Sequence, residues 1–373
     1  MPRLVALDLA GGPSFVAALR RVWDDGDAAA PLDPRLPPLA RQRVVEALAP
    51  AAVIDATGEH PLAAGREVEP GDAIVVTTSG TTGDPKGVVL THAAIAASAN
   101  AVSARIGIDA DDHWLACLPL AHVGGLSVVT RALVLGTPLT VLPTADPAAI
   151  IAAAREGATL VSLVATALRR IDAALFRVVL LGGSRPPADR PLNSIATYGM
   201  TETGSGVVYD GRPLDGVEIR IDGAGEIHVR GPMLLRCYRD GTAPLDADGW
   251  FATGDVGSWR NDGRLHVDGR RNELIITGGE NVWPEAVEAV LQRHPTIADV
   301  AVGGRPDDEW GQAVTAYIVP SDPSAPPALT VLRAHVKQEL PAYCAPHRLL
   351  LVEAVPRTAL GKIRRSALTA LSP

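Results

Sequence analysis

Short β-rich runs alternate with amphipathic helical runs from Asp72 to Leu181, and this alternation constrains the fold more than any other feature of the chain. The β-rich runs fall at 73–77, 139–142, 159–163 and 177–181, and the helical runs at 93–105 and 147–155. Strands that alternate with helices are typical of a largely parallel sheet covered by helices. The sequence therefore predicts α/β layers here.

The pattern changes on both sides of this region. The first seventy residues suggest a helix at 15–23 and a Pro-rich connector at 31–38. Beyond Val217, we expect a hairpin of 217–221 with 226–229, strands at 265–268, near 300, near 314 and at 348–353, and helices at 284–293 and 329–340. We therefore predict a large N-terminal domain, residues 1–269, of α/β layers with a small β subdomain. A small mobile α+β domain, residues 270–373, would follow.

Composition excludes several classes of protein. The 373 residues include 34 Lys and Arg against 42 Asp and Glu, and a formal charge of −8 argues against nucleic-acid binding. The three cysteines, Cys117, Cys237 and Cys344, are too dispersed for a zinc knuckle or a redox pair. No apolar run reaches the roughly 18 residues of a membrane span. We expect a cytoplasmic protein without stable membrane association.

Only three of the 34 basic residues are lysines, namely Lys86, Lys337 and Lys362. Arginine replaces lysine easily where only surface charge is needed, but a compact ammonium that makes point contacts with phosphate or carboxylate is harder to replace. The lysines are therefore candidate site residues. Lys337 matches no motif, and we expect it to be a solvated helix residue.

The first lysine, Lys86, belongs to a Gly- and hydroxyl-rich segment, Thr77 to Gly87, that follows a predicted β-rich run. Glycines let backbone amides approach phosphate, hydroxyls donate to its oxygens, and Lys86 neutralises charge. A Walker A loop is excluded because Gly87 follows the lysine. A hairpin turn without a ligand is the alternative. The candidate ATP-binding residues are Thr78, Ser79, Gly80, Thr81, Thr82 and Lys86.

This segment, with the order of the motifs after it, resembles the acyl-adenylate-forming superfamily of acyl-CoA synthetases, adenylation domains and luciferases. The likeness runs from Ala73 to Ala367. It implies an acyl-CoA synthetase-like fold, ATP and Mg²⁺ as ligands, and CoA as a second substrate. The C-terminal domain would act as a mobile lid.

The resemblance also assigns roles to single residues. In the run 198–203, Tyr198 and Gly199 would contact the adenine, Thr201 the phosphates, and Glu202 would ligate Mg²⁺. Asp255 resembles the carboxylate that accepts both ribose hydroxyls. Gly183 and Arg270 would complete the ATP site.

Three further motifs belong to the predicted lid domain. Asn272 stands at the hinge, where the family more often has Asp or Lys. Gly278 and Gly279 resemble the loop that lines the pantetheine tunnel. Lys362 lies in Pro356–Ile363, which resembles the C-terminal catalytic motif, and its ammonium would stabilise charge as the carboxylate attacks the α-phosphate.

The acyl pocket is suggested by the run 118–126, which resembles the substrate motif of the superfamily. It contributes His122 and Gly125. Arg131 lies nine residues after His122 in an otherwise apolar segment, where a guanidinium needs an anion. It could instead reach solvent or pair with an Asp. Otherwise it offers a bidentate site for a second carboxylate of the substrate.

His122 together with Arg131 resembles the o-succinylbenzoate–CoA ligases of menaquinone biosynthesis. Their small-molecule substrate has an aliphatic carboxylate to activate and an aromatic one to recognise. Other aryl- or acyl-CoA ligases, a stand-alone adenylation enzyme, and a non-catalytic nucleotide-binding protein are the alternatives. Only 76 residues precede the phosphate loop, which leaves the outer pocket wall and the oligomeric state open, a homodimer included.

Overall fold

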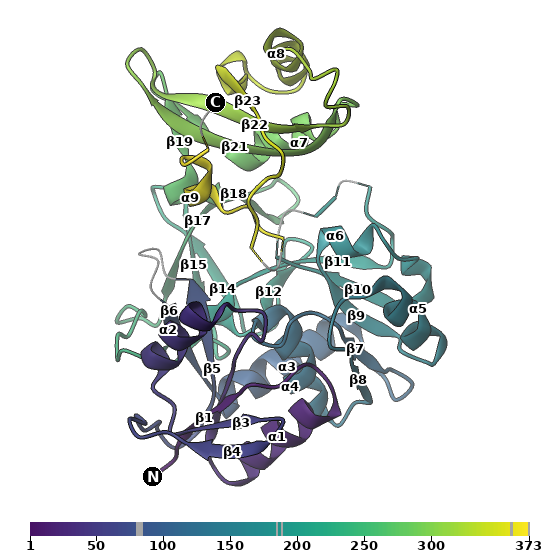
Figure 1. Cartoon of the computed structure of the whole chain (residues 1–373), viewed down its shortest axis with the longest axis vertical. Coiled ribbons are helices and arrows are strands. Elements are labelled where there is room, and N and C mark those ends of the chain that lie inside the picture. The colour runs from purple at the N-terminus through teal and green to yellow at the C-terminus, as the bar shows by residue number, and fades with distance from the viewer. Residues whose placement is uncertain (80–84, 184–185, 188, 359–360, 372–373) are drawn as a thin grey trace. The chain divides into compact units, whose positions relative to one another are not determined.

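The computed structural model describes the chain except residues 80–84, 184–185, 188, 359–360 and 372–373. Contacts divide it into two compact units (Figure 1). Unit 1 comprises Met1–Ile219 and Val229–Ala252, and unit 2 comprises Arg220–His228 and Thr253–Pro373. Among the described residues, no helix combines the length and the apolar character that a bilayer span requires.

The first sheet of unit 1 has seven strands. In spatial order they are β16 (Cys237–Tyr238), β6 (Pro85–Thr91), β5 (Asp72–Ser79), β2 (Ala28–Pro31), β1 (Leu4–Leu7), β3 (Ala52–Asp55) and β4 (Gly58–Pro61). Helix α1 (Pro13–Asp24) packs on β1 and β2, and α2 (Pro38–Leu48) packs on β6. Strands β1 to β4 were not predicted from the sequence. Strand β2 is Ala-Ala-Ala-Pro, which has weak β propensity and forms through parallel pairing with β1 and β5.

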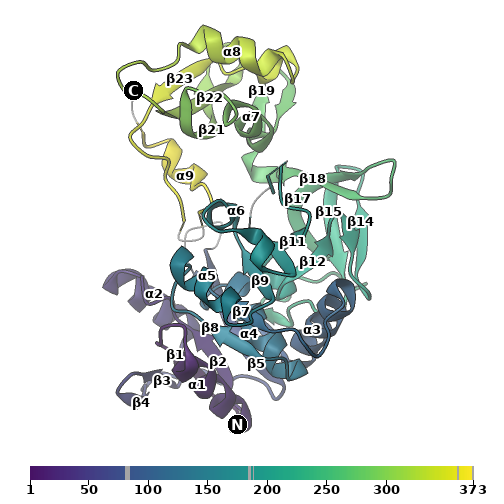
Figure 2. The same ribbon diagram turned by 90° about the vertical axis from the view of Figure 1, so that its right-hand side faces the viewer.

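The second sheet of unit 1 carries the predicted α/β alternation (Figure 2). Its order is β13 (Arg212–Pro213), β12 (Gly206–Tyr209), β11 (Ser194–Gly199), β10 (Val178–Leu181), β9 (Leu160–Leu163), β7 (Trp114–Ala116) and β8 (Leu139–Val141). Its helical elements are α3 (His92–Ile106), α4 (Val123–Leu135), α5 (Pro147–Arg155), α6 (Ala165–Leu168), η1 (Ala173–Leu175) and η2 (Thr201–Thr203). The strands from β8 to β11 are parallel, so the layers predicted from the sequence are confirmed.

Most of unit 2 consists of two smaller sheets. One has the order β14 (Glu218–Ile221), β15 (Glu226–Arg230), β17 (Phe251–Trp259) and β18 (Leu265–Arg270). The other has β20 (Glu280–Val282), β19 (Ile275–Thr277), β22 (Gly311–Pro320) and β21 (Ile297–Asp307), with β23 (Arg348–Leu351) beside β22. The helical elements are α7 (Pro284–Leu291), α8 (Leu329–Lys337), α9 (Arg365–Leu368), η3 (Arg271–Glu273) and η4 (Ala342–Cys344).

Helix α7 illustrates how local sequence builds unit 2. Pro284 occupies the first turn, where its missing N–H costs nothing, and Glu285 complements the helix dipole. Val287, Val290 and Leu291 recur at helical spacing and are buried against the sheet. The predicted class, an α/β protein with a smaller α+β part, is confirmed. The boundary at 269/270 and the lid motion stay predictions.

Candidate active site

Strands β5 and β6 form an antiparallel pair that presents the predicted phosphate segment in unit 1. Thr78 lies opposite Lys86, and the backbone of Ser79 pairs with that of Pro85. Lys86 is half-buried, and its Nζ lies 5.5 Å from the centroid of the Tyr238 ring. Gly80, Thr81 and Thr82 lie outside the described residues.

The predicted adenine and magnesium motif follows at the end of β11. Tyr198 is half-buried in this strand, and Gly199 ends it. A Cβ on Gly199 would lie only 2.2 Å from the carbonyl oxygen of Ser205, so this turn requires glycine. The 3₁₀ turn η2 then begins with Thr201 and Glu202.

Glu202 is well suited to a divalent cation. The Tyr238 hydroxyl donates to its Oε1 at 3.0 Å, and among the described residues no cationic side chain pairs with this carboxylate. Carboxylate oxygen is the ligand type that Mg²⁺ prefers. Lys86 and Glu202, which the sequence analysis assigned to phosphate and metal, thus both contact one aromatic residue that it did not single out.

His122 and Gly125 lie at the start of α4, where the acyl pocket was predicted. A Cβ on Gly125 would lie 2.3 Å from the carbonyl oxygen of Leu118, so glycine lets the helix approach this backbone closely. The His122 Nε2 lies 3.8 Å from an oxygen of Asp33, an acidic residue supplied by the N-terminal region. Burial lowers the pKa of His122 although Asp33 opposes it, which favours the neutral imidazole at neutral pH.

Arg131 is the most unusual side chain of the predicted pocket. It is 2% exposed, its Nη2 donates to Ser205 Oγ at 3.2 Å, and its Cζ lies 4.8 Å from the Trp114 ring centroid. Among the described residues, its Nε and Nη1 have no hydrogen-bond partner. Desolvation lowers the pKa of Arg131, although Tyr209 opposes this. Of the alternatives left open above, solvent and an Asp partner are thus both wrong for the described part of the chain.

A small cavity adjoins this guanidinium. It is lined by Leu90, Ala94, Ile95, Ser98, Ala99, Ser127, Thr130, Arg131, Gly204 and Met233. Apolar and hydroxyl side chains surround a single cation. Because an unpaired buried charge is costly, a ligand that meets this guanidinium should carry an anionic group.

Unit 2 holds the predicted ribose residue together with Arg270. Asp255 is 5% exposed, and the Arg270 Nε lies 2.7 Å from its Oδ1 across the β17–β18 pair. Thr253 Oγ1 accepts from the Asp255 backbone N–H at 3.0 Å. The two residues assigned to the nucleotide are therefore neighbours.

Lys362 belongs to the same unit and is accessible to solvent. Its backbone N–H donates to Thr358 Oγ1 at 3.2 Å. Partial desolvation by neighbouring protein and then the charge of Arg270 lower the pKa of its ammonium, while Asp255 opposes this change. Lys362 therefore lies in the electrostatic environment of the Asp255–Arg270 pair.

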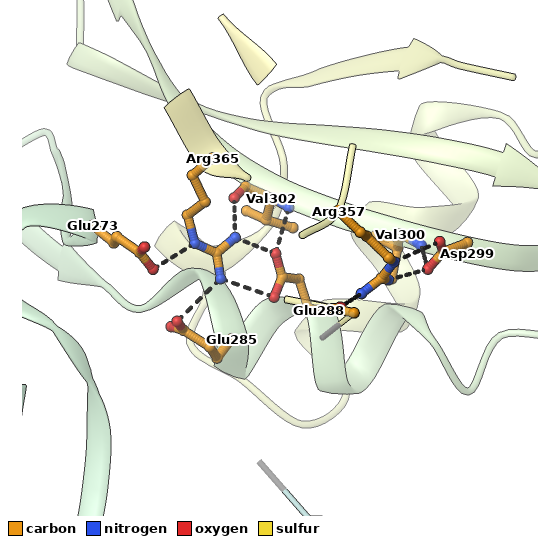
Figure 3. Close-up of polar contacts among 9 residues, drawn as sticks. Glu273, Glu285, Glu288, Asp299, Val300, Val302, Arg357 and Arg365 are labelled. Atoms are coloured by element: carbon orange, nitrogen blue, oxygen red, sulfur yellow. Dashed lines mark hydrogen bonds and ion pairs between the residues drawn. The ribbon is translucent and has the colours of Figure 1, made fainter. Parts of the chain in front are cut away.

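The segment after Lys362 is anchored by Arg365, which the sequence analysis did not single out (Figure 3). Its Nε donates to Glu273 at 2.7 Å, its Nη2 pairs with Glu285 at 3.0 Å, and its Nη1 donates to the Val302 carbonyl at 2.9 Å. Glu288 binds both Nη atoms. We call these four charged residues the Arg365 cluster. It ties α9 to α7, η3 and β21.

The remaining predicted residues are less informative. Asn272 is exposed in η3. Gly278 and Gly279, both exposed and with positive φ, form the tight turn between β19 and β20. Gly183 follows β10 with φ +83°. Lys337 is exposed on α8, as expected. The roles assigned to the three glycines and to Asn272 stay predictions.

Comparison with known proteins identifies the class. The AMP-binding enzyme family model matches residues 58–239, and the model of the AMP-binding enzyme C-terminal domain matches residues 286–362. The chain belongs to the AMP-binding enzyme family, so the resemblance stated from its motifs is confirmed.

The similar proteins are more specific. A probable 2-succinylbenzoate–CoA ligase of Mycobacterium tuberculosis (strain H37Rv) is 40% identical over 365 residues, covering 88% of this chain and 93% of that protein. The o-succinylbenzoate CoA synthetase MenE of Bacillus subtilis, solved with the acyl-adenylate OSB-AMP, matches with a TM-score of 0.88 at 28% identity and covers 98% of this chain and 88% of its own. The same synthetase solved with ATP and magnesium gives a TM-score of 0.87 at 28% identity, with coverages of 98% and 89%.

Proposed function

We propose that the protein is an AMP-forming ligase that adenylates 2-succinylbenzoate with Mg-ATP and then transfers the acyl group to CoA. AMP and pyrophosphate are the other products. Family membership supports the two-step chemistry, and the relatives named 2-succinylbenzoate–CoA ligase support the substrate. A small dicarboxylic acid, ATP and CoA are then its partners.

The main structural support for this substrate is the buried Arg131. Two of its nitrogen atoms have no partner among the described residues, and Ser205 and Trp114 hold the guanidinium in place. A carboxylate would accept from one of these nitrogens together with the Nη2 between them, which is the bidentate geometry that guanidinium favours. 2-Succinylbenzoate has one carboxylate for Arg131 and a second, aliphatic one for activation.

The other residues fit the remaining steps. Lys86 and Glu202 would bind the phosphates and the Mg²⁺, which neutralises phosphate charge. The Asp255 carboxylate would accept the ribose hydroxyls, with Arg270 beside it. Lys362 would donate to the attacking carboxylate and the α-phosphate, where negative charge develops in the transition state. The small glycines Gly278 and Gly279 would let the CoA thiol pass close to the backbone.

ATP–pyrophosphate exchange across a panel of acids tests this proposal. The panel includes 2-succinylbenzoate and 4-oxo-4-phenylbutanoate, which lacks only the ring carboxylate. Arg131→Gln should raise KM for 2-succinylbenzoate by about 30-fold or more and change KM for the analogue little, because a buried charge pair is lost. Arg155→Gln, an exposed arginine of α5, is the matched control.

Two outcomes would contradict the proposal. If the wild-type enzyme prefers the analogue, or an acid with no second carboxylate, the substrate is another aryl or acyl acid. If Arg131→Gln leaves KM for 2-succinylbenzoate unchanged, the guanidinium does not bind the ring carboxylate.

A further inference from the structure

One short segment of unit 1, Leu235–Arg239, contacts both ends of the proposed phosphate and metal site. The Leu235 N–H donates to the backbone carbonyl of Glu202 at 2.8 Å. Two residues on, β16 pairs with β6, so that Tyr238 lies opposite Val88. The Arg239 N–H then donates to the Gly87 carbonyl at 2.6 Å. The segment therefore bridges the turn that bears Glu202 and the strand that bears Lys86.

The Tyr238 side chain repeats this bridge. Its hydroxyl donates to Glu202 Oε1 at 3.0 Å, and its ring lies under the Lys86 ammonium at 5.5 Å. Lys86 and Glu202 carry opposite charges, yet they form no ion pair with each other. The aromatic ring gives the ammonium a favourable contact that does not use the carboxylate. Among the described residues no side chain pairs with the other oxygen, Oε2, which is therefore available to another ligand.

The next residue holds Tyr238 in place. Arg239 is 9% exposed, and its guanidinium donates to the carbonyls of Leu48 at 2.9 Å and Glu67 at 2.6 Å. It also donates to the carbonyls of Ala49 and Arg66. These bonds tie the end of β16 to α2 and the loop after β4. A side chain placed on such a rigid backbone is pre-organised for its contacts.

We propose that Tyr238 is a positioning residue that prepares Glu202 for a divalent cation and keeps Lys86 apart from it. The inference rests on the proposed function and adds a residue that acts through Glu202. The hydroxyl occupies Oε1 and fixes the carboxylate, so that Oε2 is available to the cation. The ring prevents Lys86 and Glu202 from neutralising each other before Mg-ATP binds.

Binding of Mn²⁺, followed by its EPR signal in the presence of α,β-methylene-ATP and no acid, tests this inference in the full-length protein. Tyr238→Phe keeps the ring and removes the hydroxyl, and it should weaken Mn²⁺ binding by about five- to tenfold. Glu202→Gln should weaken it further. Because Tyr238 acts through Glu202, the double variant should match Glu202→Gln alone.

The ring is tested separately. Tyr238→Leu should weaken binding of the nucleotide without metal, whereas Tyr238→Phe should not, because only leucine removes the contact with Lys86. Tyr317→Phe in unit 2 is the control, since it loses only a hydroxyl that accepts from Arg305 Nε at 3.0 Å. Thermal unfolding shows whether each variant is folded.

Each result either supports or overturns the inference. Unchanged Mn²⁺ binding in Tyr238→Phe, or additive losses in the double variant, would overturn the role of the hydroxyl. Equal nucleotide binding in the leucine and phenylalanine variants would overturn the role of the ring. If the wild-type protein binds neither Mn²⁺ nor the nucleotide analogue, the proposed function itself fails.

Discussion

Two buried arginines among the described residues of unit 1 differ in how their guanidinium groups are satisfied. Arg239 donates to four backbone carbonyls. Two lie at the end of α2, on Leu48 and Ala49, and two lie in the loop after β4, on Arg66 and Glu67. Arg131 donates to one serine hydroxyl and lies against an indole ring, and two of its nitrogens have no partner among the described residues. Both are 9% exposed or less.

The difference separates a structural cation from a ligand-binding one. Burial lowers the pKa of Arg239 to about 10, so it stays protonated at neutral pH, and its carbonyl partners compensate for lost water. Arg131 lacks such compensation. An incompletely satisfied buried donor is costly for the folded state unless a ligand completes its hydrogen bonds.

The largest effect is expected at Arg239. Arg239→Met leaves the carbonyls of Leu48 and Glu67 without their donors, and it should lower the free energy of unfolding by about 3 kcal/mol or more. Urea denaturation measures the loss. A urea midpoint equal to that of the wild type would show that Arg239 does not stabilise the fold.

Arg365 extends the comparison to unit 2, because carboxylates rather than carbonyls satisfy it (Figure 3). Hydrogen bonding to Glu288 raises the pKa of Arg365 although burial opposes it. Since Arg365 lies three residues after Lys362, Arg365→Gln should displace the proposed catalytic ammonium. We expect ATP–pyrophosphate exchange to fall by about ten- to a hundredfold.

The two half-reactions distinguish positioning from general damage. Lys362→Ala should abolish adenylation and leave thioesterification of supplied acyl-AMP much less affected, and Arg365→Gln should show the same asymmetry in weaker form. Arg365→Lys should recover only part of the rate, because an ammonium cannot pair with several carboxylates as a planar fork does. Equal loss of both half-reactions would contradict a role through Lys362 and, for Lys362→Ala, the hinge model.

Sequence predicted the parts of this molecule that local chemistry determines. For helix α7, the proline at its start, the acidic residue in its first turn and the spacing of its apolar residues all lie within one short stretch of sequence. Family motifs located Lys86, Glu202, Asp255 and Lys362, and the structure places the first two around Tyr238 and the last two near Arg270. Short-range patterns were sufficient for these features.

Contacts between distant segments could not be predicted in this way. Strand β2 reads as an Ala-rich connector, and only its pairing with β1 and β5 makes it a buried strand. Tyr238 reaches Glu202 across 36 positions of sequence, and Arg365 reaches Glu273 across 92. Arg131 was identified because it interrupts an apolar segment. That no carboxylate of the described residues pairs with it is a property of the packed interior.

The smallest effect is expected at Arg131, and it tests the ligand-binding half of the comparison. Arg131→Met keeps similar volume and can pack its sulfur against Trp114, while it removes a buried charge that the protein satisfies only in part. In the same urea titration, its free energy of unfolding should lie within about 1 kcal/mol of the wild-type value or above it. If Arg131→Met lowered the free energy of unfolding as much as Arg239→Met, Arg131 would stabilise the fold. A residue that serves ligand binding is expected to destabilise the unliganded protein instead.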